Sequence, residues 1–493
     1  MKTLDSIIPS GSCRPGLRAG DAGETRYEQL ARRVQERIER GTLRPGDRIP
    51  SVRQCSGHER VSVATVLQAY RCLEDRGWIE ARPQSGYYVK ARHWTPPPEP
   101  VRSDPGSGAV RVYVSQLTLE VIQAARRPDL VPLGAALPDL EAYPLGPLNR
   151  ALSVAARRHP TAAHAFEPPP GWLPLRRQIA RRALEAGCEL APDDILVTVG
   201  ATEALSLALR AVASPGDTIA IESPCFFGVL QMIESLGMRA CEIPTCPRDG
   251  VGLEDLRRRL QACRVRACVF SPNFSNPLGS RMPDESKAAL VRMLTERRIP
   301  LIEDDIYGNL AFGVGRPRAA KSYDRDGWVL LCDSFTKTLS PGIRLGWIAP
   351  GRFREKVALL KYVSTGASPT LPQMAVADFL QDGGFDHHLR RVRLAYTRQL
   401  REMSEAIGRH FPGGTRLTRP TGGMCLWVEL PGTVDAMEMH RRALESGISI
   451  APGPMFSPKG RYRQCIRISV ANPWSPEMEA AVIRLGRIAG DLM

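Results

Sequence analysis

The sequence predicts an α/β protein in two parts, a small helical module at the N-terminus and a large doubly wound domain behind it. The chain of 493 residues is too long for one ordinary hydrophobic core. Residues 24–92 contain three helical patterns followed by two short β-prone runs. From residue 116 onward, apolar strand candidates alternate with helical segments, which is typical of a parallel sheet with helices on both faces.

The composition excludes a membrane-spanning protein. Apolar residues make up 43% and charged residues 24% of the chain, and no run approaches the roughly 18 apolar residues that a span needs. The first residues include an acid and a proline where a signal peptide needs its apolar core, so we expect a cytoplasmic protein. The twelve cysteines stand singly without Cys-x-x-Cys spacing, so we expect reduced thiols and no metal site.

A net charge of +15 indicates an anionic partner, but charge alone does not separate nucleic acid from phosphorylated metabolites. Where the charge lies is more informative. Between Glu24 and Arg92 there are fourteen Lys and Arg residues against nine Asp and Glu, an excess of five positive charges in a small module.

Residues 1–23 have no periodicity and are predicted to form a flexible arm. The module proper, residues 24–92, begins with apolar residues at helical spacing: Tyr27, Leu30, Ala31, Val34 and Ile38. Ser51 and Ser62 are candidate N-caps of a second and a third helix. The third helix is expected to bury Val66, Leu67, Tyr70 and Leu73. The runs 78–81 and 87–89, separated by Pro83-Gln84-Ser85-Gly86, predict a hairpin.

Three helices and a hairpin in about seventy residues predict a winged helix-turn-helix, in which the third helix enters the major groove of DNA. A small basic helical domain is also compatible with binding another protein. Three sequence motifs of this module indicate its type more specifically than its charge does. They are Arg44-Pro45-Gly46-Asp47-Arg48, Val61-Ser62-Val63-Ala64-Thr65 and Ser85-Gly86-Tyr87-Tyr88-Val89.

These motifs resemble the GntR-type winged helix along its whole length. The resemblance implies that Arg53 contacts phosphate or base, that Ser62 and Thr65 face DNA and that Gly86 lies at the wing tip. The family commonly has arginine where this chain has Val63, and Arg60 is a candidate to replace that contact. For Arg53 and Arg60 the alternative is a solvated surface.

Residues 93–115 are predicted to be a linker. Four of residues 96–100 are prolines, and glycine and serine dominate residues 103–108, so neither stretch is expected to form a helix or a ladder. We expect a stiff part and a flexible part that together tether the two domains.

Five apolar runs in residues 116–493 are strand candidates: 195–199, 218–221, 267–270, 300–302 and 328–332. Each ends in a polar or turn-forming cluster. Because ligands of such sheets bind beyond the carboxyl ends of the strands, we expect these clusters to converge on one crevice.

The clusters suit the parts of a phosphorylated pyridine aldehyde. Gly200-Ala201-Thr202 opens a helix whose free N–H groups favour an anion. Residues 222–228 offer an aromatic face, residues 271–279 an amide donor, and one of the acids Glu303, Asp304 and Asp305 a carboxylate for a protonated ring nitrogen. Taken singly, these residues are also explained by a tight turn, core packing, an Asn-Pro turn or a helix cap.

Lys337 follows the last of these strands among small hydroxyl residues. Its amine could form a Schiff base with pyridoxal phosphate, while Ser334 and Arg344 supply donors for phosphate oxygens. A surface lysine in a Ser/Thr loop is the alternative.

In order and spacing, residues 130–475 resemble the fold-type-I pyridoxal-phosphate aminotransferases, which have a doubly wound sheet with a smaller α+β domain. The resemblance implies a Schiff base at Lys337 and phosphate contacts from Gly200, Ala201, Thr202, Ser334 and Arg344. It also implies ring contacts from Phe226, Asn276 and Tyr307, pairing of the ring nitrogen with Asp304 in preference to Asp305, and a substrate carboxylate held by Arg467. The chain departs from the family at Phe166 and Phe226, where tyrosine is usual.

A GntR-type DNA-binding domain joined to an aminotransferase-like domain resembles the MocR family of transcriptional regulators. That resemblance implies a regulator that senses an amino compound, or pyridoxal phosphate itself, and binds operator DNA as a head-to-tail homodimer. Two alternatives stay open: an active aminotransferase with a DNA-binding appendage, and a nucleic-acid-associated scaffold with an empty pocket.

Overall fold

The computed structural model describes residues 25–39, 42–44, 46–75, 77–90, 96–124, 127, 129–313 and 315–493. The predicted arm, residues 1–23, lies outside the described residues. The chain divides into two compact units, residues 1–93 and residues 94–493. Each is described by itself.

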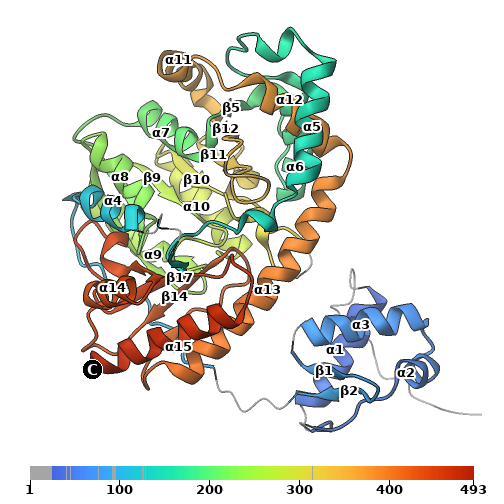
Figure 1. The fold of residues 1–493 in the computed structure, drawn as a ribbon. Helices are drawn as coiled ribbons and strands as arrows, with labels where there is room; N and C mark the ends of the chain where they lie inside the picture. Colours follow the sequence, from blue (N-terminus) through green and yellow to red (C-terminus); the bar gives the residue numbers. More distant parts are fainter. Residues whose placement is uncertain are drawn as a thin grey trace, which may run out of the picture. The chain divides into compact units, whose positions relative to one another are not determined.

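The smaller unit consists of three helices and a hairpin (Figure 1). The helices are α1 (Arg26–Glu39), α2 (Val52–Glu59) and α3 (Val63–Asp75), and the hairpin strands are β1 (Ile79–Arg82) and β2 (Gly86–Val89). The strands pair antiparallel, with Ile79 opposite Val89. This order confirms the predicted winged helix-turn-helix fold.

Local sequence explains where these helices begin and end. Ser51 caps α2 in a reciprocal capping box with Gln54, and Arg60 ends that helix in a left-handed conformation. The Ser62 hydroxyl accepts the Thr65 N–H at 3.1 Å at the start of α3. One expectation is wrong: Leu67 is 36% exposed, because the buried stripe of α3 runs through Val66, Ala69, Tyr70 and Leu73 instead.

The larger unit is built on a nine-stranded sheet of order β3-β7-β6-β9-β10-β11-β12-β5, with β8 attached to β7. The strands are β3 (Val110–Arg111), β5 (Leu196–Thr198), β6 (Thr218–Ser223), β7 (Arg239–Cys246), β8 (Gly250–Val251), β9 (Val265–Phe270), β10 (Leu301–Asp304), β11 (Val329–Ser334) and β12 (Gly346–Ala349). Strands β7, β6, β9, β10 and β11 are parallel, and β12 runs antiparallel between β11 and β5. All five predicted strands are present.

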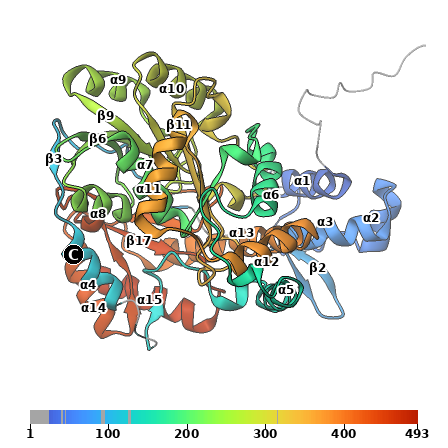
Figure 2. The same ribbon diagram turned by 90° about the horizontal axis from the view of Figure 1, so that it is seen from above.

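Helices cover both faces of this sheet (Figure 2), which confirms the doubly wound arrangement. On one face pack α7 (Gly200–Val212), α8 (Phe227–Ser235) and α11 (Arg354–Thr365), and on the other α9 (Leu253–Ala262) and α10 (Asp284–Glu296). The pleat separates the two cores, since Ile219 and Ile221 face the α7 side and Ala220 faces the α10 side.

A second, antiparallel sheet of order β13-β14-β17-β16 belongs to the C-terminal part. Its strands are β13 (Arg416–Leu417), β14 (Cys425–Glu429), β16 (Ala451–Pro452) and β17 (Cys465–Ser469), and a separate parallel pair joins β4 (Val131–Pro132) to β15 (Ile448–Ser449). Three helices accompany them: α13 (Gly384–His410), α14 (Ala436–Glu445) and α15 (Pro476–Asp491). The α15 helix approaches α13 closely at Gly486, where a Cβ would lie 2.2 Å from the His410 carbonyl oxygen.

The other α-helices in the described part of the larger unit are α4 (Ser115–Ala124), α5 (Leu145–Arg158), α6 (Leu173–Ala183) and α12 (Thr370–Gln381). No helix in the described ranges is long and apolar enough to cross a membrane.

The described part of the predicted linker lies on the larger unit. The Pro98 carbonyl accepts the Leu417 N–H at 2.8 Å, and the Ser103 hydroxyl accepts the Thr245 N–H at 2.8 Å. Strand β3, at the end of this segment, pairs with β7. The backbone from residue 96 to β3 is therefore fastened at several points, although its composition predicts no ladder.

Candidate functional site

A cavity of about 370 Å³ opens beyond the carboxyl ends of the central strands. Most of the side chains that the sequence singles out line it: Ala201, Thr202, Phe226, Asn276, Asp304, Tyr307, Lys337, Arg344 and Arg467. Two do not. Gly200 lies behind Arg344, and the buried Ser334 uses its hydroxyl to accept the Thr336 N–H at 3.2 Å.

Lys337 stands in the turn after β11, with its amine inside the cavity. The amine donates to the carbonyl oxygen of Ala136 at 2.6 Å. Burial lowers the pKa of Lys337 to about 8, because a charged ammonium loses its hydration there. Because a lower pKa raises the neutral fraction of the amine at pH 7, this lysine is a better nucleophile than an ordinary one.

Asp304 ends β10 and points at the same cavity. Among the described residues, its carboxylate accepts a hydrogen bond from the Ile306 N–H alone, at 3.4 Å, and burial raises its pKa to about 7. The neighbouring Asp305 is already paired with Arg316 and accepts the Asn273 amide at 2.9 Å. Asp304 is thus the acid that still needs a cationic partner.

A corner of the cavity that is suited to an anion lies at the start of α7. The helix has no side-chain cap, so the N–H groups of its first turn remain directed outward. Gly200 adopts a φ of +75°, and a Cβ there would lie 2.7 Å from the Arg344 guanidinium. Only glycine allows the guanidinium to approach this helix end so closely.

Arg467, on β17, is a buried cation that lines the cavity. Its exposed fraction is 2%, and it donates to the Asn276 side-chain oxygen at 3.1 Å and to the Gly134 carbonyl. Its Nε is buried without a hydrogen-bond partner, and no described carboxylate forms an ion pair with it. A buried guanidinium in this state is suited to a carboxylate ligand that accepts two N–H groups.

The charges of the cavity fit a phosphorylated cofactor together with a carboxylate. Lys337, Arg344 and Arg467 face it against the single described carboxylate of Asp304. Together, the narrow corner at Gly200, the underpartnered Asp304 and the orphaned Nε of Arg467 match pyridoxal phosphate and an amino acid.

Part of the apolar lining of the cavity was not predicted. It comprises Val121 and Ile122 on α4, Leu137, Phe227, Ala451 and Met455. Neither these apolar residues nor the Ala136 carbonyl belongs to a motif, so no pattern in the sequence separates them from core residues. Phe166 lies outside the lining and is 64% exposed.

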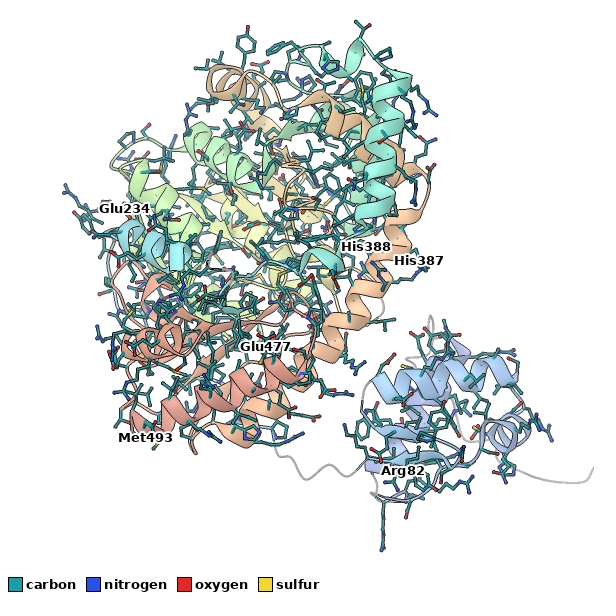
Figure 3. The ribbon with its side chains drawn as sticks, viewed as in Figure 1. Arg82, Glu234, His387, His388, Glu477 and Met493 are labelled. Carbon is teal, nitrogen blue, oxygen red and sulfur yellow. The ribbon has the colours of Figure 1, made fainter. Side chains whose placement is uncertain are left out.

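In the smaller unit the predicted DNA-facing residues are accessible. Arg53 on α2, Arg60 after it and Ser62 before α3 are exposed, and Thr65 is half-buried with its hydroxyl 2.8 Å from that of Ser62. Gly86 begins β2 with a φ of +107°. Two basic residues near the hairpin were not among the predicted DNA-facing residues. Arg48 packs over Gly86, and Arg82, labelled in Figure 3, lies over the Tyr88 ring at 4.4 Å.

Two family models match the chain. Residues 129–485 match the aminotransferase class I and II family, and residues 26–89 match the bacterial regulatory proteins of the gntR family. The first match covers more than half of the chain.

Curated relatives share both parts. The HTH-type transcriptional regulator YjiR of Escherichia coli (strain K12) is 40% identical over 94% of this chain and 98% of its own length. The probable rhizopine catabolism regulatory protein MocR of Rhizobium meliloti is 28% identical over 88% of this chain and 87% of its own.

A similar solved structure covers the larger unit. The α-aminoadipate aminotransferase LysN of Thermus thermophilus, complexed with N-(5'-phosphopyridoxyl)-L-leucine, matches with a TM-score of 0.71 and 29% identity. The match covers 78% of this chain and 96% of that one.

Proposed function

Because the chain belongs to the aminotransferase class I and II family and carries a gntR-family helix-turn-helix domain, we propose that it is a pyridoxal-phosphate-dependent transcriptional regulator. The part that binds operator DNA is residues 24–92, the linker is 93–115 and the sensor is 116–493. The sensor responds to an amino compound or to pyridoxal phosphate itself. Its relatives along almost the full length are named as transcriptional regulators, which favours regulation over metabolism.

The observation that carries this proposal is the charge of the cavity. Three cations surround it, and the most deeply buried of them, Arg467, has no described anionic partner. A dianionic phosphate at Gly200 and Arg344 and a carboxylate at Arg467 would neutralise this charge. The same cavity therefore suits both a cofactor and a small amino acid.

In this proposal each side chain has a distinct task. Lys337 provides the amine that attaches the cofactor, and Asp304 stabilises a positive ring nitrogen. Ala201, Thr202 and Arg344, which line the cavity, hold the phosphate, while Asn276 and Tyr307 fix the ring oxygen and Phe226 covers a ring face. When bound, pyridoxal phosphate supplies an electrophilic carbon for amines and a ring that withdraws electrons.

On the smaller unit, Arg53 on α2, Thr65 on α3, and Arg60 and Ser62 between these helices would contact DNA, and Gly86 would shape the wing. A homodimer would present two such units to repeated half-sites. The exposed side chains of α11, Leu359 (62%), Tyr362 (58%) and Val363 (71%), offer an apolar surface for a second copy.

A second candidate function is an active aminotransferase. The lowered pKa of Lys337 favours it, because a partly neutral amine can also move protons. Incubation of the protein with amino acids and keto acids separates the two: sustained amino transfer supports the enzyme, and a spectral change without product supports the sensor.

The deciding experiment is a DNA shift assay on the promoter beside the protein's own gene. It is run with the apo-protein, with added pyridoxal phosphate, and with a panel of amino compounds. Cofactor-dependent and ligand-dependent changes in DNA affinity are expected. They should disappear in Lys337→Ala, and a variant that responds like the wild type would contradict the proposal.

A further inference from the structure

We propose that Tyr143 and His388 are positioning residues for Lys337, because each of them holds a backbone carbonyl of the turn that carries this lysine. The inference rests on the proposed function, since it concerns the amine that would attach the cofactor. Neither side chain lines the cavity. Both act on the amine through the backbone of the turn after β11.

The turn leaves one carbonyl on each side of Lys337 without a backbone partner. Within the turn, the Leu339 N–H donates to the Phe335 carbonyl at 2.8 Å. No backbone N–H in the described part of the chain donates to the carbonyl of Thr336 or to that of Thr338. Because a carbonyl without a partner is costly away from water, side chains have to supply the missing donors.

Tyr143 supplies the first donor. Its hydroxyl donates to the Thr336 carbonyl at 2.9 Å, although the two residues are 193 positions apart in the chain. Tyr143 is 4% exposed and lies between the short 3-10 helix η1 (Leu140–Ala142) and α5. Burial raises the pKa of Tyr143, so the hydroxyl keeps the proton that it donates.

His388 on α13, labelled in Figure 3, supplies the second donor. Its Nε2 lies 2.8 Å from the Thr338 carbonyl, and the residue is 3% exposed. Since a carbonyl oxygen can only accept, Nε2 carries the proton of the ring. Burial lowers the pKa of His388 to about 4, so the ring is neutral near pH 7, and Nδ1 is buried without a partner among the described residues.

Together the two hydrogen bonds hold the turn on either side of Lys337. The direction in which the lysine side chain leaves the backbone depends on this turn, and the amine reaches the Ala136 carbonyl at 2.6 Å. A turn that is already held loses little conformational freedom when the amine attaches a cofactor. If either bond is removed, the amine should gain access to water, and its pKa should rise toward that of an ordinary lysine.

The first measurement uses the apo-protein, so it does not depend on the cofactor. The full chain is labelled with trace acetic anhydride at a series of pH values, and acetylation of Lys337 is quantified by mass spectrometry. The midpoint of the wild type should lie near pH 8. Tyr143→Phe keeps the buried ring and lacks only the hydroxyl, so it should fold, and its midpoint should rise by at least about half a pH unit.

The other groups around the amine stay the same in this comparison. The charges that act on it come from Asp304, Arg344, Arg467 and the Cys425 thiol, and none of these is substituted. Tyr396→Phe is the matched control, because Tyr396 is 1% exposed and no described hydrogen bond joins its hydroxyl to the turn. Its midpoint should equal that of the wild type.

The second measurement is the affinity for pyridoxal phosphate, with the melting temperature recorded on the same samples. Tyr143→Phe and His388→Leu should each bind the cofactor about fivefold to tenfold more weakly, which corresponds to one hydrogen bond. His388→Gln should recover most of this loss, because the glutamine Nε2 can donate to the same carbonyl. A purely structural role would lower the melting temperature and leave the midpoint and the affinity unchanged.

The outcomes separate this inference from the proposed function. The inference is overturned if Tyr143→Phe keeps the midpoint and the affinity of the wild type, or if Tyr396→Phe shifts the midpoint equally. Equal impairment of His388→Gln and His388→Leu overturns it for His388, and if His388→Leu does not fold, Tyr143→Phe still decides. If the wild type takes up no pyridoxal phosphate, the proposed function fails, while the acetylation midpoints still show whether the two residues position the amine.

Discussion

The amine of Lys337 and the carbonyl oxygen of Ala136 are 2.6 Å apart, so the turn after β11 and the loop after β4 meet inside the cavity. The two residues are about two hundred positions apart in the chain. Their contact places a buried amine where a cofactor aldehyde would reach it.

Cofactor uptake should depend on pH through this amine. The pKa of Lys337 is lowered to about 8, and only the neutral amine attacks an aldehyde. The uptake rate should therefore fall about tenfold for each pH unit below 8 and level off above it. Stopped-flow absorbance measures this, with Lys337→Ala as the blank. A midpoint near 10, the range of an ordinary lysine, would contradict the assignment.

Asp304→Asn should lower the affinity for the cofactor, whereas Asp305→Asn should lower the stability of the fold. Asp304 accepts one long backbone hydrogen bond, so its amide variant should keep the apo-protein's melting temperature within about 2 °C. Cofactor affinity should drop at least about tenfold. Asp305→Asn instead leaves the buried Arg316 poorly paired, since Asp333 is 3.8 Å from it, and should cost about 3 kcal/mol of stability. Thermal melts and cofactor titrations of both variants form the matched comparison.

The cavity residues at the strand ends could be predicted, because the sequence around each of them shows that it follows a strand. Asn276, Asp304 and Lys337 each follow an apolar run, and parallel strands bring their carboxyl ends to one edge. The cavity residues on α4 could not be predicted from the sequence. Ile122 resembles any other apolar helical residue, and only tertiary packing places it beside the cavity.

Four of the nine strands of the central sheet were not predicted, and β7 and β12 show why. The β7 sequence contains Arg239, Glu242 and Pro244, and its fit depends on β6 and β3 beside it. The four-residue β12 begins at Gly346, where a Cβ would lie 2.5 Å from the Gly200 carbonyl carbon. Close approach between distant backbones, rather than strand propensity, determines that glycine.

His388 should make stability fall in acid. Its Nε2–H donates to the Thr338 carbonyl at 2.8 Å, one residue from Lys337, and burial lowers its pKa to about 4. Because the unfolded chain takes up this proton near pH 6.5, the contribution is present above that pH and is lost as the pH falls toward 4. The loss should be at most about 3 kcal/mol.

The measurement is denaturant unfolding of the wild type and His388→Gln between pH 4 and 7.5. The difference between their free energies of unfolding should decrease as the pH falls. The exposed neighbour His387, also labelled in Figure 3, gives the control His387→Gln, which should parallel the wild type. A constant gap for His388→Gln would show that its titration has no effect.

Val363→Asp should break the proposed homodimer. Val363 is 71% exposed on α11 beside the exposed Leu359 and Tyr362, and a charge buried in an apolar interface is strongly unfavourable. Light scattering at micromolar concentration should show a monomer. Leu394→Asp, at a 58% exposed position on α13, should leave the dimer intact. A dimeric Val363→Asp protein would exclude this surface as the interface.

The base preference of α3 should depend on Val63. This residue is 46% exposed at the start of the helix, where an apolar side chain can contact a thymine methyl and an arginine would instead pair with guanine. Val63→Arg should change the preferred base pair at one position of each half-site from T·A to G·C, by roughly tenfold to a hundredfold. Selection from a randomised operator library at fixed salt measures this change. Arg53→Ala provides the contrast, since loss of a phosphate contact should weaken binding to all sequences alike and reduce the salt dependence. If Val63→Arg weakens or strengthens every sequence equally, Val63 does not read a base.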